Sequence, residues 1–324
     1  MIKVEGLTKR YARTLAVDNV SFEVAKGQIV GFLGPNGAGK TTTMRVLTCF
    51  LPPSDGRAEV AGHDVVTSPM EVKRRIGYLP ETPPLYPEME VEEYLTFVGR
   101  LKGVPKPDLA RRVSEVAERC NVADVRKKLI SKLSKGYRQR VGLAQAVIHN
   151  PDVLILDEPT AGLDPKQIIE TRQLIKELAG EHTIILSTHI LPEVEQTCEQ
   201  VIIINKGKVV ATDSVQNLTH RLRGAEAIAV ELSAREGELA APAAQQKLEQ
   251  VSGVSRVVSK EGRDGRLRFE VESLQGRHIR PDLARAVVEA GWNLHELHSV
   301  AFSLEEIFLQ LTSADAAAQQ GGAQ

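Results

Sequence analysis

The stretch Ile29–Thr42, IVGFLGPNGAGKTT, decides the fold of this chain. Its first five residues are apolar or glycine, which is typical of a buried strand. Residues 34–41 match the pattern G-x-x-x-x-G-K-T, and a helix is expected directly afterwards, over residues 41–50. In such a loop, backbone N–H groups turn inward on phosphate oxygens at the positive end of the helix. The stretch therefore predicts an α/β core that binds a nucleotide.

The side chains of this loop have separate expected roles. Lys40 should reach the β- and γ-phosphates, and the Thr41 hydroxyl should bind Mg²⁺, which prefers oxygen ligands. The alternative, a glycine-rich turn without function, is disfavoured by the complete match and by the strand and helix on either side. The residues expected to hold ATP here are Gly34, Pro35, Asn36, Gly37, Ala38, Gly39, Lys40, Thr41 and Thr42.

A second apolar stretch, Val153–Glu158, ends in two acids. Burying Asp157 at the end of such a strand is costly unless a cation meets it, and Mg²⁺ bound through water is the natural partner. Glu158 is one residue further, so strand alternation predicts that it faces the other way. It is the best candidate for the general base that activates the attacking water. The alternative is that Asp157–Thr160 simply caps a helix.

Composition limits the remaining function classes. The chain has 324 residues, enough for roughly two domains, and a net charge of -1, which gives no electrostatic case for nucleic-acid binding. Its three cysteines are far apart and odd in number, so neither a disulfide framework nor a metal site is indicated. No apolar run approaches the ~20 residues that span a bilayer, and residues 1–5 carry charge at once. We expect a cytoplasmic protein whose membrane segment, if any, comes from a partner.

The chain divides into two parts with different patterns. Residues 1–222 alternate strand-like and helix-like stretches, as α/β folds do, except that residues from about 85 to 150 show only helical patterns. This predicts a helical subdomain inserted into the nucleotide core. Expected helices cover residues 90–101, 108–120 and 134–149, and expected strands cover residues 153–156, 183–187 and 201–204.

Residues 225–312 form a separate α+β domain by pattern. The order β-α-β-β-α-β, with Gly291 closing the second helix, is the ferredoxin-like order. One more helix is expected over residues 304–311. The Ala/Gln/Gly-rich tail, residues 313–324, is predicted to be disordered.

The segment Leu133–Arg140, LSKGYRQR, resembles the signature L-S-G-G-Q of ABC ATPases. Three further segments match the family in the same chain order: DEPT at 157–160, AGLDP at 161–165 and STH at 187–189. The resemblance covers residues 1 to about 222. It implies a P-loop NTPase fold of the ABC type.

The resemblance also implies roles for individual residues. Ser134 and Gly136 would face the γ-phosphate held by a second copy of the chain, so that ATP joins a homodimer, and Asp164 lies in the loop that contacts the other copy. His189 matches the switch histidine, against the alternative of a satisfied core histidine. Tyr11 lies where the family places an aromatic that stacks on adenine, against the alternative of an ordinary aromatic.

Two departures from the family pattern stand out. Lys135 and Tyr137 replace a glycine and a glutamine of the signature, while Ser134 and Gly136 keep the geometry of an anion site. Glu81 stands where the family has the metal-binding glutamine of its Q-loop, and a carboxylate there would bind Mg²⁺ more strongly or repel the γ-phosphate without it. Glu81, the segment PPLYPEMEV at 83–91 and the ending of residues 303–308 resemble type-2 exporters, in particular the gliding-motility-associated group.

The function expected from the resemblance is that of an ATP-hydrolysing subunit that drives export through a separate membrane permease. It would lie at the inner face of the membrane as a homodimer. The alternative is a soluble regulatory or interaction ATPase that does not transport. For residues 225–312, a dimerising or stabilising role and a ligand-sensing role both remain open.

Overall fold

The structure is a computed structural model that describes residues 1–215, 217, 227–235, 239–262, 266–274 and 276–300. It forms two compact units, residues 1–215 and residues 216–324, each of which is described by itself. The helix expected over residues 304–311 and the tail over residues 313–324 lie outside the described residues.

Two sheets form the body of the first unit. One has six strands in the order β10-β9-β3-β8-β7-β6, and the strands from β9 to β6 run parallel. The other is antiparallel, in the order β2-β1-β4-β5. Their bounds are β1 Ile2–Tyr11, β2 Thr14–Val24, β3 Ile29–Leu33, β4 Asp55–Val60, β5 His63–Asp64, β6 Ile76–Leu79, β7 Val153–Asp157, β8 Thr183–Thr188, β9 Gln200–Asn205 and β10 Lys208–Ser214.

One hydrophobic core joins the two sheets. Side chains of both sheets and of α1 (Lys40–Leu47) share it, and the rings of Phe22 and Phe32 lie 5.5 Å apart within it. The central strands β3 and β7 are buried at every position, which explains why their sequences are continuous apolar runs rather than alternating ones. The phosphate loop follows the end of β3 and the paired acids lie at the end of β7, so both are held in place by strands that are buried on both faces.

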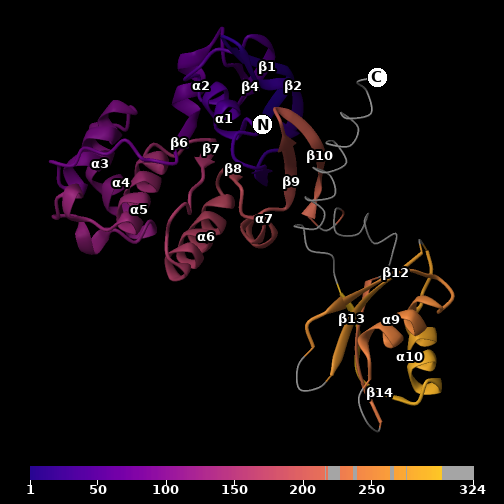
Figure 1. The fold of residues 1–324 in the computed structure, drawn as a ribbon. Coiled ribbons are helices and arrows are strands. Elements are labelled where there is room, and N and C mark those ends of the chain that lie inside the picture. Colours follow the sequence, from indigo (N-terminus) through magenta and orange to yellow (C-terminus); the bar gives the residue numbers. More distant parts are fainter. Residues whose placement is uncertain (216, 218–226, 236–238, 263–265, 275, 301–324) are drawn as a thin grey trace. The chain divides into compact units, whose positions relative to one another are not determined.

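The predicted helical stretch is present as three helices that gather at one end of the first unit, beside β6 (Figure 1). They are α3 (Val91–Leu101), α4 (Lys106–Arg119) and α5 (Lys135–Val147), with short 3-10 turns at 123–125 and 130–132. Helix α3 begins with a capping box formed by Glu90 and Glu93. Three other helices cover the sheets: α2 (Pro69–Arg75), α6 (Pro165–Ala179) and α7 (Leu191–Thr197).

The second unit has the predicted order of elements. Its antiparallel sheet runs β12-β13-β11-β14, and its helices pack on it around Phe269 and Val230. Gly291 follows the second helix with φ 77° and donates to Val288 O, as its predicted capping role requires. The bounds are β11 Ala227–Ala234, α9 Ala241–Glu249, β12 Val254–Lys260, β13 Leu267–Ser273, α10 Arg280–Glu289 and β14 Trp292–Val300.

Among the described residues, no helix has both the length and the apolar composition needed to cross a membrane.

Candidate functional site

The loop between β3 and α1 needs glycine for two physical reasons. Gly37 and Gly39 have φ values of 79° and 107°, which side-chain-bearing residues rarely adopt. A Cβ on Gly34 would lie 2.4 Å from Ile204 O, and one on Gly39 would lie 2.5 Å from Ala16 O. The backbone at Gly34 and Gly39 therefore passes too close to its neighbours for any side chain, and α1 begins directly after the loop, at Lys40.

Lys40 is the buried cation of this site, with 6% of its surface exposed. Its Nζ donates to Gly34 O at 2.8 Å and to Pro35 O at 3.3 Å, and it lies 3.4 Å from Glu158 Oε1. Two of its neighbours are neutral carbonyls, so Glu158 is the charge that balances it. A phosphate group entering the site would compete with Glu158 for this ammonium group.

Asp157 ends β7 with only 1% of its surface exposed. Its Oδ1 accepts a hydrogen bond from Thr41 Oγ1 at 3.3 Å and another from Ser187 Oγ. Burial raises the pKa of this carboxyl, and the neighbouring charges of Glu158 and Glu81 raise it further. Asp157 accepts from two hydroxyl groups and has no cation within salt-bridge distance among the described residues, so its surroundings fit a divalent cation.

Glu158 differs from the sequence expectation in its direction. Strand alternation would place it opposite Asp157, but β7 ends at Asp157 and Glu158 takes φ 49°, outside the strand. Its N–H donates to Ser187 O at 3.0 Å, which holds the turn. As a result, both carboxylates reach the phosphate loop, since Asp157 contacts Thr41 and Glu158 contacts Lys40.

His189 completes this arrangement from the end of β8. Its Nδ1 lies 2.9 Å from Glu158 Oε2, a distance that fits N–H donation to the carboxylate. Glu158 therefore stands between Lys40 and His189, with one oxygen toward each. The histidine is a partner of the site rather than a core residue, because 45% of its side chain is exposed.

Lys40, Thr41, Glu158 and His189 line one cavity of about 250 Å³, which we call the nucleotide cavity. It brings together residues of the phosphate loop, Glu158, His189 and also Glu81, which follows β6. Asp157 and Thr41 offer the oxygen donors that Mg²⁺ prefers, and this ion usually takes one or two carboxylates and completes its shell with water and phosphate. The full lining is Ala16, Asn36, Gly37, Gly39, Lys40, Thr41, Thr42, Glu81, Glu158, Ala161 and His189.

Eight residues predicted for the site are not part of this lining. Gly34, Pro35 and Ala38 belong to the phosphate loop itself, and Asp157 contacts that loop through Thr41. The other four, Tyr11, Ser134, Gly136 and Asp164, lie on other elements. Ser134 begins α5, where its Oγ accepts a hydrogen bond from Tyr137 N at 3.4 Å, and Asp164 caps α6 through Gln167 N at 2.9 Å. Gly136 packs so closely on α6 that a Cβ would lie 2.2 Å from Gln167 Oε1. Tyr11 ends β1 with 39% of its surface exposed, and Lys9 Nζ lies 5.5 Å from its ring.

Four residues around these groups were not predicted as site residues. Ala16 and Ala161 line the nucleotide cavity as small side chains that leave room for a ligand. Nothing in the local sequence marks Ala16, whereas Ala161 begins the AGLDP segment. Ser187 holds Asp157 and Glu158, and its place at the start of the STH segment is the signal that could have been used. Gln139 is buried in α5 beside Glu81, where the helical pattern alone gives it no role.

Comparison with known proteins agrees with this geometry. The family model described as ABC transporter matches residues 17–161. The daunorubicin resistance ATP-binding protein DrrA3 of Streptomyces coeruleorubidus is 35% identical over 97% of this chain and 96% of its own. The bacitracin transport ATP-binding protein BcrA of Bacillus licheniformis is 41% identical over 69% of this chain and 72% of its own.

A solved ATP-binding subunit of an ABC transporter is 29% identical, with a TM-score of 0.63, over 69% of this chain and 93% of that one. The relative DrrA3 aligns along nearly the whole chain, so the similarity includes the second unit as well as the first. By its fold, its phosphate loop and these relatives, the chain belongs to the ATP-binding proteins of ABC transporters, and it is an ABC-type ATPase.

Proposed function

We propose that this chain is the ATP-hydrolysing subunit of an exporter and that it drives a separate membrane permease. The observation that supports the catalytic part is the nucleotide cavity, in which Lys40, Glu158 and His189 form one row of contacting side chains beside Thr41 and Asp157. This row offers a phosphate-binding cation, a base and a partner for that base within a single unit.

The row suggests how the residues divide the work. Phosphate oxygens would replace Glu158 on Lys40 Nζ, which releases one carboxylate oxygen toward the attacking water. His189, 2.9 Å from the other oxygen, would hold the carboxylate in place while Glu158 accepts the proton from that water. Thr41 and Asp157 would hold Mg²⁺, which neutralises charge on the phosphates when bound.

We also propose that two copies of the chain share each ATP. The start of α5 supports this, because Ser134 and the backbone near Gly136 present an anion-binding helix end that lies outside the nucleotide cavity of its own chain. Asp164, at the start of α6 next to Gly136, would contact the opposite copy. Tyr11, partly exposed on the β1–β2 hairpin, would stack on adenine.

The names of the relatives support the proposed permease partner and direction of transport. Those named for daunorubicin resistance and bacitracin transport are 35% and 41% identical to this chain. We therefore propose an export function, with the chain at the inner face of the membrane through its permease and with no nucleic-acid partner. Co-purification of one multi-span membrane protein with the tagged chain would support this. Recovery of the chain only as a soluble dimer with full ATPase activity would favour the regulatory alternative.

The catalytic part is tested by Glu158→Gln. This variant removes the proton acceptor and the charge that competes for Lys40, so turnover should fall by about 10²- to 10⁴-fold while ATP binding tightens. The variant should also remain dimeric in ATP, as measured by sedimentation. The matched control is Glu181→Gln, whose side chain is 56% exposed and pairs with Arg119 away from the site. Undiminished turnover of Glu158→Gln would remove Glu158 as the base.

A further inference from the structure

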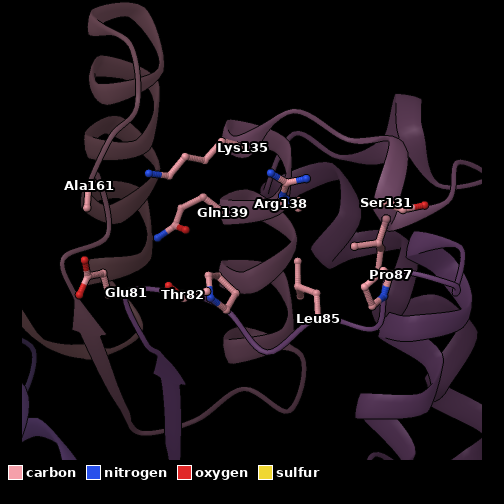
Figure 2. Close-up of a pocket in the computed structure, with 11 residues that line it drawn as sticks. Glu81, Thr82, Leu85, Pro87, Ser131, Lys135, Arg138, Gln139 and Ala161 are labelled. Carbon is pink, nitrogen blue, oxygen red and sulfur yellow. The ribbon is translucent and has the colours of Figure 1, made fainter.

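A second cavity of about 390 Å³ lies between the loop that follows β6 and the first turns of α5, and we call it the loop cavity. It shares Glu81 and Ala161 with the nucleotide cavity, so these two residues stand between the two spaces. Figure 2 shows the side chains around it. Its lining is Glu81, Thr82, Pro83, Leu85, Pro87, Ile130, Ser131, Lys135, Arg138, Gln139 and Ala161.

Gln139 presents an unused donor in this cavity. The residue is 5% exposed, and its Nε2 is buried without a hydrogen-bond partner among the described residues. In Figure 2 its amide end extends to the side of the cavity where Glu81 and Ala161 lie. A buried amide donor without an acceptor is costly, so an acceptor that enters this space would be bound favourably.

Lys135 brings positive charge to the same side of the cavity. Its Nζ lies 2.2 Å from the position that a Cβ on Gly162 would occupy, so the ammonium group is directed toward the segment that carries Ala161. No carboxylate of the described residues lies within salt-bridge distance of it. The other cation of the lining, Arg138, donates to Leu133 O at 3.1 Å. Lys135 and Gln139 therefore form a donor pair that matches a carboxylate.

Glu81 is the only carboxylate of the lining, and it faces both cavities. The prolines on either side, Pro80 and Pro83, restrict the backbone there, so a change of cavity would come from rotation of the side chain. Burial raises the pKa of Asp157 and the nearby Glu81 charge adds to that rise, as expected for two carboxylates that repel each other.

We infer that Lys135 and Gln139 form a carboxylate site whose occupant is Glu81. When the phosphates of ATP enter without a metal ion, the Glu81 carboxylate turns away from them and binds Lys135 Nζ and Gln139 Nε2. Lys135 is then a positioning residue for Glu81. Two of the departures from the family pattern, Lys135 in the signature segment and Glu81 after β6, then compensate each other across the loop cavity. The inference rests only on ATP binding in the nucleotide cavity, and not on dimerisation or transport.

The test is a double-mutant cycle on the full chain with Glu81→Gln, Lys135→Met and the double variant. Affinity for metal-free ATP is measured at protein concentrations where sedimentation shows a monomer. Lys135→Met should weaken binding about threefold to fivefold when Glu81 is present, the range for a partly exposed ion pair, and much less in the Glu81→Gln background. Lys135→Arg should restore the affinity, and the coupling should shrink at high salt.

The matched control is Lys132→Met, a lysine that ends the 3-10 turn 130–132 without lining the loop cavity. Its effect should be the same in both backgrounds. A Lys135→Met effect that persists undiminished in Glu81→Gln would overturn the inference, because the lysine would then act on ATP or on another carboxylate. A chain that shows the coupling but drives no transport leaves the inference intact and contradicts only the proposed export.

A second variant tests the amide. Because Gln139 Nε2 has no partner among the described residues, Gln139→Leu should fold with undiminished stability to urea, yet it should reduce the Glu81–Lys135 coupling. A destabilised Gln139→Leu chain with full coupling would show that the amide is structural and would remove it from the site.

Discussion

Gly77 of β6 offers a sharp test of how the helical subdomain is held on the nucleotide core. The residue pairs with Leu154 of β7 and packs under α5. A Cβ at Gly77 would lie 2.1 Å from Ala146 O and 2.7 Å from Leu154 Cδ2. The first contact is with backbone, which no side-chain rotation can relieve.

The expected cost of Gly77→Ala follows from this distance. Ordinary contact begins at 3.4 Å, so α5 and β6 must separate by about 1 Å along a buried seam. Overpacking of this kind typically costs 1–3 kcal/mol, and since backbone must move we expect about 3 kcal/mol. The variant should also shift the loop after β6 relative to α5. The resulting loss in the free energy of ATP binding should be smaller than the loss in the free energy of unfolding.

Urea unfolding measures this cost. The only tryptophan of the chain, Trp292, lies in the second unit, so its fluorescence follows that unit while far-UV circular dichroism is dominated by the first. Gly77→Ala should lower the dichroism midpoint and leave the fluorescence midpoint unchanged. The control is Gly180→Ala, because nothing lies within 4 Å of its added Cβ and its φ of -61° suits alanine, so stability should stay or rise by up to about 1 kcal/mol.

An unchanged dichroism midpoint for Gly77→Ala would refute the reasoning, since it would mean that α5 does not pack on β6 as closely as the distances indicate. Equal losses for Gly77→Ala and Gly180→Ala would refute it too, by showing that the loss is not specific to the seam.

Three further outcomes follow from the same structure. Phe269→Ala, at a fully buried position of the second unit, should cost about 3–5 kcal/mol and lower the Trp292 fluorescence midpoint without changing the first unit. Asp157→Asn should raise the stability of the nucleotide-free chain at neutral pH. The folded-state pKa of Asp157 is raised, so stability of the parent chain falls as pH rises from the usual pKa of an aspartate to the raised value. The asparagine variant should lack this dependence when urea midpoints are measured against pH. Burial lowers the pKa of His149 from 6.5 to about 4, so the folded chain resists protonation of this histidine. The free energy of unfolding should therefore rise by about 3 kcal/mol as pH rises from 4 to 6.5. His149→Gln should flatten the curve of urea midpoint against pH.

The sequence predicts the central strands well because their physical signal is local. Strand β3 and strand β7 are buried on both faces, so each is an apolar run in the sequence, and the phosphate loop and the paired acids lie at their ends. The ferredoxin-like order of the second unit was predictable for the same reason, since its turns and caps are marked by glycine and its strands by β-branched residues. Contacts between distant segments carried no such signal.

Glu158 shows where local reasoning fails. Alternation along a strand would separate it from Asp157. The turn at Glu158 is instead held by hydrogen bonds to Ser187 of the neighbouring strand β8, a residue 29 positions further along the chain that no local pattern links to it. The loop cavity shows the same limit. Glu81 and Lys135 can each be recognised in the sequence as departures from the family pattern, but it is the packing of α5 on β6 that brings them to the same cavity. The roles assigned to Tyr11, Ser134, Gly136 and Asp164 stay predictions, because each depends on a ligand or a second copy.

The left-handed backbone of Glu158 has a consequence for how this chain can change. A glutamate at φ 49° costs about 1 kcal/mol relative to glycine, so the residue proposed to accept the proton is also one that the fold tolerates poorly. Glycine or asparagine at position 158 would relieve that cost, but it would abolish the base and leave the buried Lys40 ammonium group without its balancing carboxylate. The ion pair with Lys40 outweighs the backbone strain, so a library screened for stability alone should still retain an acid at this position.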